Sequence, residues 1–360
     1  MKLAKFFALA LASLAFVACG GDKGDNTSKP TGDAVLTANN SSVEVNTPIE
    51  FTVTATDGTD LTAQASFFNK TADYAQVSNP FIPEMDGDYE FYAVVGTILT
   101  NTVKVSVVPT IPELPADAQP ENTSFNHRIL LVDHTGNTCG FCPQMMLALK
   151  EVEETGDYHS KYYEAMAHTY STGDPAYSAA AAAVSNHFGV NNYPTLTYNL
   201  YHSTTSDRNA AHIMGQIDAL WKAEGADAGI AAAASLAATS VIVNVEVKAA
   251  VANDYRVTAW LLEDGIEAKQ TNATEEWMNI HDNAIRQRVD SDDLSGVDLG
   301  TMAAGETKDV ALTLRLVGTK WNRDNLKVMV LVNAKNSKGK FDVANVAICP
   351  MNDVITYDYK

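Results

Sequence analysis

Two cysteines near the middle of the 360-residue chain, Cys139 and Cys142, are separated by two residues. The apolar run 128–133 ends shortly before them, and a helical pattern begins at Cys142. Pro143 falls in its first turn, where the missing N–H of proline costs nothing. This order predicts that Cys139 lies at a helix N-terminus, where unpaired N–H groups and the helix dipole stabilise a thiolate. Because thiolate is the attacking species in disulfide exchange, we expect Cys139 to act as nucleophile and Cys142 to resolve the mixed disulfide.

Two other uses of this cysteine pair are open. The first is zinc binding, but a structural site needs four ligands and the two remaining cysteines, Cys19 and Cys349, do not form a second close pair. The second is an inert disulfide. So short a loop stabilises a fold by only ~2 kcal/mol in the chain-entropy model, against ~4.7 kcal/mol for a loop of roughly 100 residues. We therefore favour redox chemistry and expect neither a metal nor a cofactor.

The segments around the pair predict how it is positioned. Apolar runs and helical spacing alternate along residues 127–228. The order strand, thiol turn, helix, strand, helix, strand, helix predicts an α/β domain with a partly parallel sheet. The expected strands are 128–133, 162–168 and 193–198, and the expected helices are 142–152, 176–188 and 209–224.

The flanking segments have the pattern of β domains. Short alternating strands separated by turns predict a small β-sandwich over 33–108, which resembles bacterial immunoglobulin-like modules. Four prolines between positions 109 and 120 predict a stiff linker over 109–126. From 229 to 360 the strand pattern returns and predicts a C-terminal antiparallel sandwich. The expected fold class is therefore multidomain, with an α/β domain between two β domains.

The N-terminus has the layout of an export signal. Residues 1–18 carry Lys2 and Lys5 and then an apolar run, which is shorter than the roughly 20 residues needed to span a bilayer. Ordinary cleavage would leave a soluble secreted protein. However, Phe16-Val17-Ala18-Cys19 resembles the lipobox of bacterial lipoproteins, which implies lipidation of Cys19 and a membrane anchor. The polar, glycine-rich segment 19–32 then serves as a tether. By resemblance to lipoprotein sorting signals, Gly20 favours the outer membrane.

The charge balance excludes one class of partner. The chain has 25 basic and 44 acidic residues, a net charge of -19. Such an acidic protein repels the phosphate backbone, so we expect no nucleic-acid partner.

The thiol segment resembles the thioredoxin superfamily. The resemblance rests on Cys139-Gly140-Phe141-Cys142, on Asp133 six positions earlier, and on the segment 190–195. It implies that Asp133 assists proton transfer to Cys142, although Asp133 can equally be an acid that caps a turn. It also implies that Tyr193, Pro194 and Thr195 form a loop with a cis-proline, next to a disulfide between the two cysteines, and that this loop binds a substrate chain.

A wider set of motifs resembles the outer membrane protein 28-like lipoproteins from about residue 125 to the C-terminus. It comprises the lipobox, the immunoglobulin-like module, the thiol segment 135–143, His168 with Gly173-Asp174-Pro175, Tyr193-Pro194-Thr195, and Ile280-His281-Asp282-Asn283-Ala284-Ile285-Arg286. This resemblance implies an outer-membrane location but no particular activity.

Three residues near these motifs have plainer interpretations. His134 and His168 can modulate the thiolate, but histidines at strand ends are more often simply hydrogen-bonded. Cys349 ends an apolar run, and we expect it to be buried like a small hydrophobic residue.

Two functions follow as hypotheses. In the first, the chain is a membrane-tethered thiol-disulfide oxidoreductase that acts on the thiols and disulfides of exported proteins. In the second, it is a non-catalytic surface or periplasmic lipoprotein, in which the thioredoxin-like fold is a scaffold and the β domains bind a surface partner.

Overall fold

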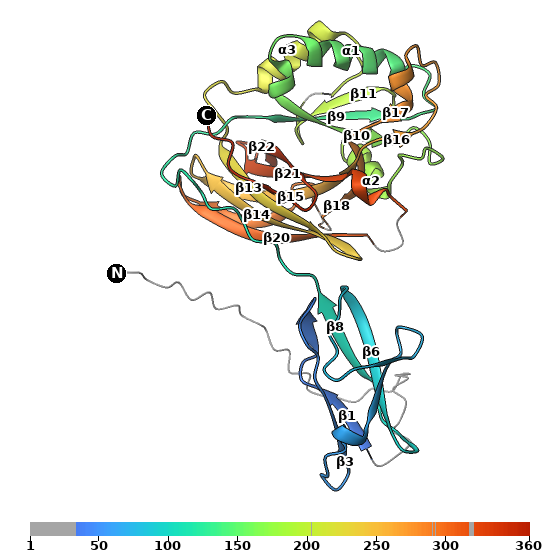
Figure 1. Ribbon diagram of the computed structural model, residues 1–360. Helices are drawn as coiled ribbons and strands as arrows, with labels where there is room; N and C mark the ends of the chain where they lie inside the picture. The colour runs from blue at the N-terminus through green and yellow to red at the C-terminus, as the bar shows by residue number, and fades with distance from the viewer. Residues whose placement is uncertain (1–33, 203, 290, 292, 317–319) are drawn as a thin grey trace. The chain divides into compact units, whose positions relative to one another are not determined.

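A computed structural model describes residues 34–360 except 203, 290, 292 and 317–319 (Figure 1). The predicted signal peptide 1–18, Cys19 and the tether 19–32 lie outside the described residues. Within the described part, no helix has the length and apolar character needed to cross a membrane.

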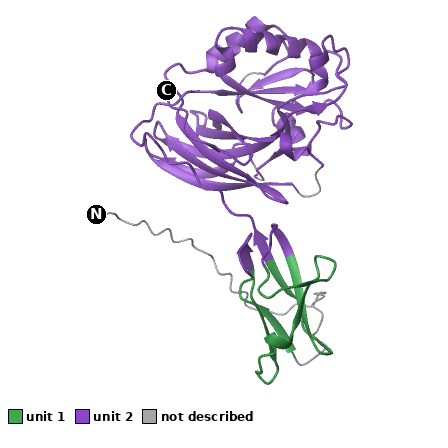
Figure 2. Cartoon of the chain, viewed as in Figure 1, with its two compact units in different colours: residues 1–41, 49–81, 89–105 green, residues 42–48, 82–88, 106–360 purple. Residues whose placement is uncertain are grey.

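The chain forms two compact units, shown in Figure 2. One comprises residues 1–41, 49–81 and 89–105, and the other comprises residues 42–48, 82–88 and 106–360. Residues contact one another mainly within each unit, but such contacts do not show that either unit folds on its own. The domain limits expected from the sequence therefore stay predictions.

The N-terminal segment contains two sheets built from short strands. Alternation produces them: in β3, Phe51 and Val53 are buried while Thr52 is exposed. Phe51 also packs against the rings of Phe67 and Phe91. β1 (Ala34–Ala38) pairs with β3 (Phe51–Ala55), and the second sheet has the order β2 (Ser42–Glu44), β8 (Val103–Val108), β6 (Gly87–Val95), β4 (Ser66–Asn69), β5 (Ala75–Val77), with β7 (Ile98–Leu99) on β6.

A nine-stranded sheet dominates the larger unit. β9 and β10 are parallel, whereas β11 is antiparallel to β9. The order is β12 (Thr204–Thr205), β11 (Thr195–Tyr198), β9 (Ile129–Thr135), β10 (Tyr162–His168), β18 (Ala284–Arg288), β15 (Asn253–Glu263), β21 (Leu326–Lys335), β22 (Phe341–Pro350), with β19 (Val297–Met302) on β15.

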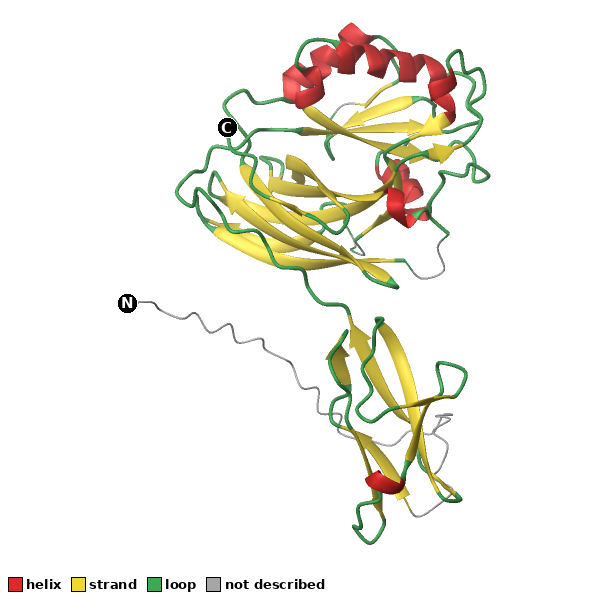
Figure 3. Ribbon diagram, in the orientation of Figure 1, coloured by secondary structure: helices red, strands yellow, loops and turns green. Residues whose placement is uncertain are grey.

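Three helices cover the first strands of this sheet (Figure 3). α1 (Cys142–Glu154) and α3 (Ala210–Leu220) pack on the face that carries Ile129 and Leu131. α2 (Ala179–His187) packs on the opposite face, which carries Leu130 and Val132. Because successive side chains of a strand point to opposite faces, β9 is buried on both sides, which explains its continuous apolar sequence.

A second sheet packs on the far half of the large one. Its order is β20 (Thr307–Arg315), β14 (Ser240–Ala249), β13 (Ala228–Leu236), β23 (Val354–Ile355). Valines and alanines of β13 and β14 share a core with alternate residues of β15 and β21. The expectation of a β-rich protein with several sheets and few helices is confirmed.

The two halves of the larger unit are joined by strand pairing. β10 pairs in parallel with β18 through Met166 and Ala284. The large sheet therefore continues from the predicted α/β segment into the predicted C-terminal β segment. A short hairpin, β16 (Ile266–Glu267) and β17 (Ile280–His281), encloses residues 268–279. We call these residues the covering loop.

Candidate redox site

Cys139 and Cys142 form a disulfide, with 5.5 Å between their Cα atoms. Cys142 is the first residue of α1, followed by Pro143, while Cys139 lies in the preceding turn and donates its N–H to the carbonyl of Gly136. Both side chains are buried, with 2 % of Cys139 and 0 % of Cys142 exposed. The turn thus holds the pair at the N-terminal end of α1 but leaves little of either sulfur open to solvent.

The covering loop lies against this turn and forms hydrogen bonds with its carbonyl groups. The Gln270 side-chain amide donates to the carbonyl oxygens of Cys139 at 2.9 Å and Gly136 at 3.4 Å. The N–H of Thr271 donates to the Asn137 carbonyl at 2.7 Å. We therefore attribute the low exposure of Cys139 to this contact, which the sequence analysis did not foresee.

Gly140, between the cysteines, allows the loop to come this close. The Asn272 side-chain amide donates to the Gly140 carbonyl at 3.1 Å, and a Cβ atom on Gly140 would lie 2.9 Å from the same nitrogen. Phe141 instead turns to solvent, 61 % exposed, with the Arg208 guanidinium 5.5 Å from its ring centre. The covering loop therefore closes one face of the turn, while the apolar side chain of Phe141 stays accessible to solvent.

Asp133 is a fully buried acid on β9, and neither carboxyl oxygen has a hydrogen-bond partner among the described residues. It shares the face of Ile129 and Leu131, which is the face covered by α1. Burial, and then repulsion by Glu164, raise the pKa of Asp133 well above its usual range. Burial thus favours the protonated form of Asp133, which can give a proton to a group beside it.

Tyr193, Pro194 and Thr195 lie at the start of β11, where the Tyr193–Pro194 peptide bond is cis. Thr195 is opposite His134 of β9, so this loop lies next to the strand that leads into the thiol turn. Pro194 and Thr195 are buried, while Tyr193 is half-buried and packs edge-on against the exposed ring of Tyr170.

Tyr170 connects this loop to the thiol turn. A Cβ atom on Gly136 would lie 2.6 Å from the Tyr170 Cβ, and the N–H of Tyr170 donates to the Thr135 carbonyl. The structure therefore places the predicted substrate-binding residues beside the turn, with Tyr170 and Tyr193 as the accessible aromatic groups.

His134 belongs to the opposite face of the sheet. Its ring lies 2.8 Å from the hydroxyl of Ser185 on α2 and 3.0 Å from that of Thr197. Burial lowers the pKa of His134 to about 3. His134 is therefore a neutral, hydrogen-bonded residue directed away from α1.

His168 and Asp174 form a buried pair that the sequence analysis missed. The His168 ring is 2.9 Å from an Asp174 oxygen that also accepts the N–H of Asn137, at 2.7 Å, in the thiol turn. Burial by itself raises the pKa of Asp174, but hydrogen bonds from His168 and from the amides of Asn137 and Ala176 outweigh it and lower the pKa to about 2. The ionised carboxylate therefore fixes the start of the turn.

His281 extends this group of residues to the covering loop. Its ring centre is 4.8 Å from that of His168, and its Nε2 lies 3.1 Å from the carbonyl of Ala268. Three of the motif residues noted in the sequence, His168, Asp174 and His281, thus form one continuous group behind the thiol turn. Cys349, by contrast, lies in the core between the two sheets, where burial raises the pKa of its thiol to about 11.

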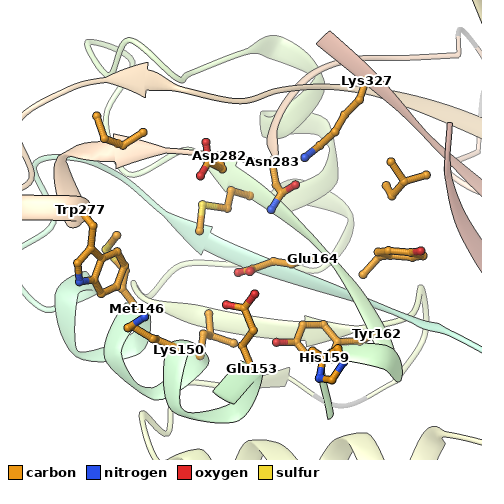
Figure 4. Close-up of a pocket in the computed structure, with 15 residues that line it drawn as sticks. Met146, Lys150, Glu153, His159, Tyr162, Glu164, Trp277, Asp282, Asn283 and Lys327 are labelled. Carbon is orange, nitrogen blue, oxygen red and sulfur yellow. The ribbon is translucent and has the colours of Figure 1, made fainter. Parts of the chain in front are cut away.

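A cavity of about 880 Å³ opens beside α1 and β10 (Figure 4). Glu164 of β10 lines it, and one of its oxygens is buried with no hydrogen-bond partner among the described residues. Burial, then repulsion by Glu153 and Asp282, raise the pKa of Glu164 to about 7 although Lys327 opposes this. The site therefore contains two carboxyl groups with raised pKa values, the fully buried Asp133 and the partly buried Glu164.

The chain is similar to known proteins over part of its length. The family model described as outer membrane protein Omp28 matches residues 181–352. This range includes β11 and the covering loop but not Cys139, Cys142 or Asp133. A solved structure, HBP35 of Porphyromonas gingivalis, is similar with a TM-score of 0.51 and 15 % identity, covering 63 % of this chain and 76 % of that chain. This likeness concerns the fold alone. No curated protein sequence matches the chain.

Proposed function

We propose that the chain is a lipid-anchored outer-membrane protein whose thioredoxin-like segment carries out thiol-disulfide exchange with exported proteins. The observation that carries this proposal is the placement of the buried, unpartnered Asp133 on the sheet face covered by α1, the helix that begins at Cys142. An uncompensated buried carboxyl group costs folding free energy. A proton-transfer role next to a thiol explains why such a group is retained.

The proposed exchange conserves atoms, electrons and protons. A substrate thiolate attacks the Cys139 sulfur, a new S–S bond forms, and the Cys139–Cys142 bond breaks. Cys142 leaves as a thiolate and takes a proton from Asp133. A second substrate thiolate then displaces Cys139, so that the substrate dithiol loses two electrons and two protons and the cysteine pair gains them. In the reverse direction Cys139 attacks a substrate disulfide and Cys142 resolves it.

The surroundings of the turn favour a polypeptide as the substrate. Phe141 and Tyr170 are exposed next to the disulfide, and Tyr193 is half-exposed. Aromatic side chains at such a position bind apolar segments of an extended chain. Residues 193–195 lead into β11 and offer main-chain groups to that segment.

The location rests on two independent observations. Cys19 follows an export signal with the lipobox pattern, and the family model that matches residues 181–352 is described as an outer membrane protein. Both favour a protein held at the outer membrane by N-terminal lipid.

Trapping of substrates in cells tests the activity. In Cys142→Ala, Cys139 cannot be released from a mixed disulfide, so we expect adducts with exported proteins on non-reducing gels. The matched variant Cys139→Ala lacks the attacking sulfur and should give none. Equal adduct levels from both variants, or none from either, would contradict the exchange function.

A second candidate function has one observation in its favour. Both sulfurs are buried and the turn is hydrogen-bonded to the covering loop, which suits a structural disulfide in a non-catalytic surface or periplasmic lipoprotein that binds a surface partner. The reduction potential separates the two. Structural disulfides lie below about −300 mV. A value well above that, together with adducts, supports exchange, whereas a value below it without adducts supports the structural alternative.

A further inference from the structure

Proton transfer from Asp133 needs a route by which this carboxyl group regains a proton. This carboxyl group is fully buried on the α1 face of the sheet, and the loop closes the turn at the end of α1. A proton given to Cys142 must nevertheless be replaced. The neighbouring strand β10 carries an acidic group, Glu164, whose charge helps to raise the pKa of Asp133.

Strand register places Glu164 on the same face as Asp133. Asp133 pairs with Met166, and Glu164 pairs with Leu131, so these residues alternate on one side of two parallel strands. Met166 and Glu164 both line the 880 Å³ cavity. The buried Asp133 therefore lies on the same face as Glu164 and Met166, which border the cavity.

The cavity presents several charged and titratable groups to Glu164. They are Lys150 and Glu153 of α1, His159 and Tyr162 before and within β10, Asp282 after β17, and Lys327 of β21. Figure 4 shows the carboxyl groups of Glu164 and Glu153 directed toward each other. Lys327 is bound to Asp264 at 2.6 Å and Lys150 to Glu154 at 2.7 Å. The cations are thus engaged by other acids.

We propose that Glu164 is a positioning residue for proton transfer to the cysteine pair, which exchanges protons with solvent in the cavity and passes them to Asp133. This inference rests on the proposed thiol-disulfide exchange. In the direction that reduces the cysteine pair, the substrate dithiol is oxidised and releases two protons to solvent. Solvent protonates Glu164, Glu164 protonates Asp133, and Asp133 protonates Cys142, while Cys139 takes the second proton directly from solvent.

The electrostatics support this path. Burial and the Glu153 carboxylate raise the pKa of Glu164 to about 7, and Glu164 in turn raises that of Asp133. Two nearby carboxyl groups repel each other when ionised, so ionisation of one favours retention of the proton on the other. Glu164, at the border of the cavity, can both gain and lose its proton near pH 7.

Equilibration of the full chain with reduced and oxidised glutathione tests the proposal. This exchange consumes no net protons while all thiols are protonated, so its equilibrium constant depends on pH only through linked groups. If Glu164 is linked, its pKa differs between the oxidised and reduced protein. The ratio of the wild-type constant to that of Glu164→Gln should then change roughly three- to tenfold between pH 5.5 and pH 8.

Two further variants keep the test decisive. Glu164→Asp retains a carboxyl group and should retain the pH dependence. Glu153→Gln removes the neighbouring charge and should move the pH dependence of its own equilibrium constant to lower pH than in wild type. This comparison does not need Glu164→Gln to fold. A wild-type to Glu164→Gln ratio that stays constant with pH, or an unmoved pH dependence in Glu153→Gln, overturns the relay. Because glutathione replaces a protein substrate, this result is independent of whether Cys142→Ala traps adducts.

Discussion

The side-chain amide of Gln270 donates a hydrogen bond to the carbonyl oxygen of Cys139 at 2.9 Å, between residues 131 positions apart in the sequence. Gln270 is itself buried, with 2 % exposed. The thiol turn is therefore completed by a segment that lies far from it along the chain. The proposed exchange at Cys139 requires this contact to open or the substrate to reach the sulfur beside it.

Removing the Gln270 amide should make the disulfide easier to reduce. Gln270→Ala loses hydrogen bonds worth about 1 kcal/mol or somewhat more, so the loop opens more often and reduction by dithiothreitol should become roughly five- to tenfold faster. The rate is measured on the purified full-length chain from the appearance of free thiols. Gln287→Ala is the control, because that amide donates to the Arg315 carbonyl on another strand. Equal rates in wild type and Gln270→Ala would show that the loop does not limit access.

Adding a methyl group at Gly140 should displace Asn272. The new Cβ would lie 2.9 Å from the Asn272 amide nitrogen, so Gly140→Ala should lose the hydrogen bond to the Gly140 carbonyl and lower the free energy of unfolding by about 1 kcal/mol. In an Asn272→Gly background the same substitution should cost much less, a non-additivity that urea unfolding of the four proteins measures.

Gly215→Ala provides the matched control for Gly140. Its Cβ would meet no atom within 4 Å, in the middle of α3, so alanine there should be neutral or stabilise by about 0.5–1 kcal/mol. Additive costs for Gly140→Ala and Asn272→Gly would contradict the steric explanation.

Loss of the Asp174 charge should destabilise the protein in a pH-dependent way. Hydrogen bonds lower the pKa of Asp174 to about 2 from its ordinary value of 3.8. A lowered folded-state pKa contributes stability that is present above about pH 4 and is lost as the pH falls toward 2. We expect Asp174→Asn to lower the free energy of unfolding at pH 7 by roughly 2–3 kcal/mol and to reduce its dependence on pH between 4 and 2.

Urea unfolding at several pH values measures this effect. Asp207→Asn is the control, since Asp207 is exposed and lies 3.7 Å from His212, where surface pairs contribute little. A pH dependence that is the same in Asp174→Asn and in wild type would argue against an ionised Asp174.

The lipid anchor is tested at Cys19. If acylation of Cys19 provides the membrane attachment, as proposed, cells fed a radioactive fatty acid should label the wild-type protein and should not label Cys19→Ser. Cys349→Ser should keep the label, since Cys349 is buried in the core. Label on Cys19→Ser would mean that the N-terminus is processed in another way.

Sequence patterns predicted the elements around the turn well because their signals are local. Apolar runs and helical spacing correspond to β9, α1, β10, α2, β11 and α3, with boundaries that differ by a few residues. β13 is an instructive case, because its alanine run has high helix propensity but forms a strand paired with β14 and β23. Pairing on both sides outweighs local preference there.

The contacts that complete the site could not be predicted in this way. Gln270 and Asn272 are polar residues between turns, and exposed loops have the same composition. Asp174 precedes a proline, a pattern typical of an exposed turn, although its carboxylate is buried against His168. His134 was expected either to modulate the thiolate or to be simply hydrogen-bonded, and alternation along β9 places it on the face opposite Asp133, hydrogen-bonded to Ser185.

The pairing of β10 with β18 limits how the predicted α/β segment 127–228 can be isolated as a fragment. A fragment ending at residue 228 would lose β18 and leave one side of β10 as an unpaired edge, whose open N–H and C=O groups invite association with other chains. The same truncation would remove residues 268–279 and uncover the disulfide. Such a fragment should aggregate, and its thiol reactivity would describe a different surface from that of the intact chain.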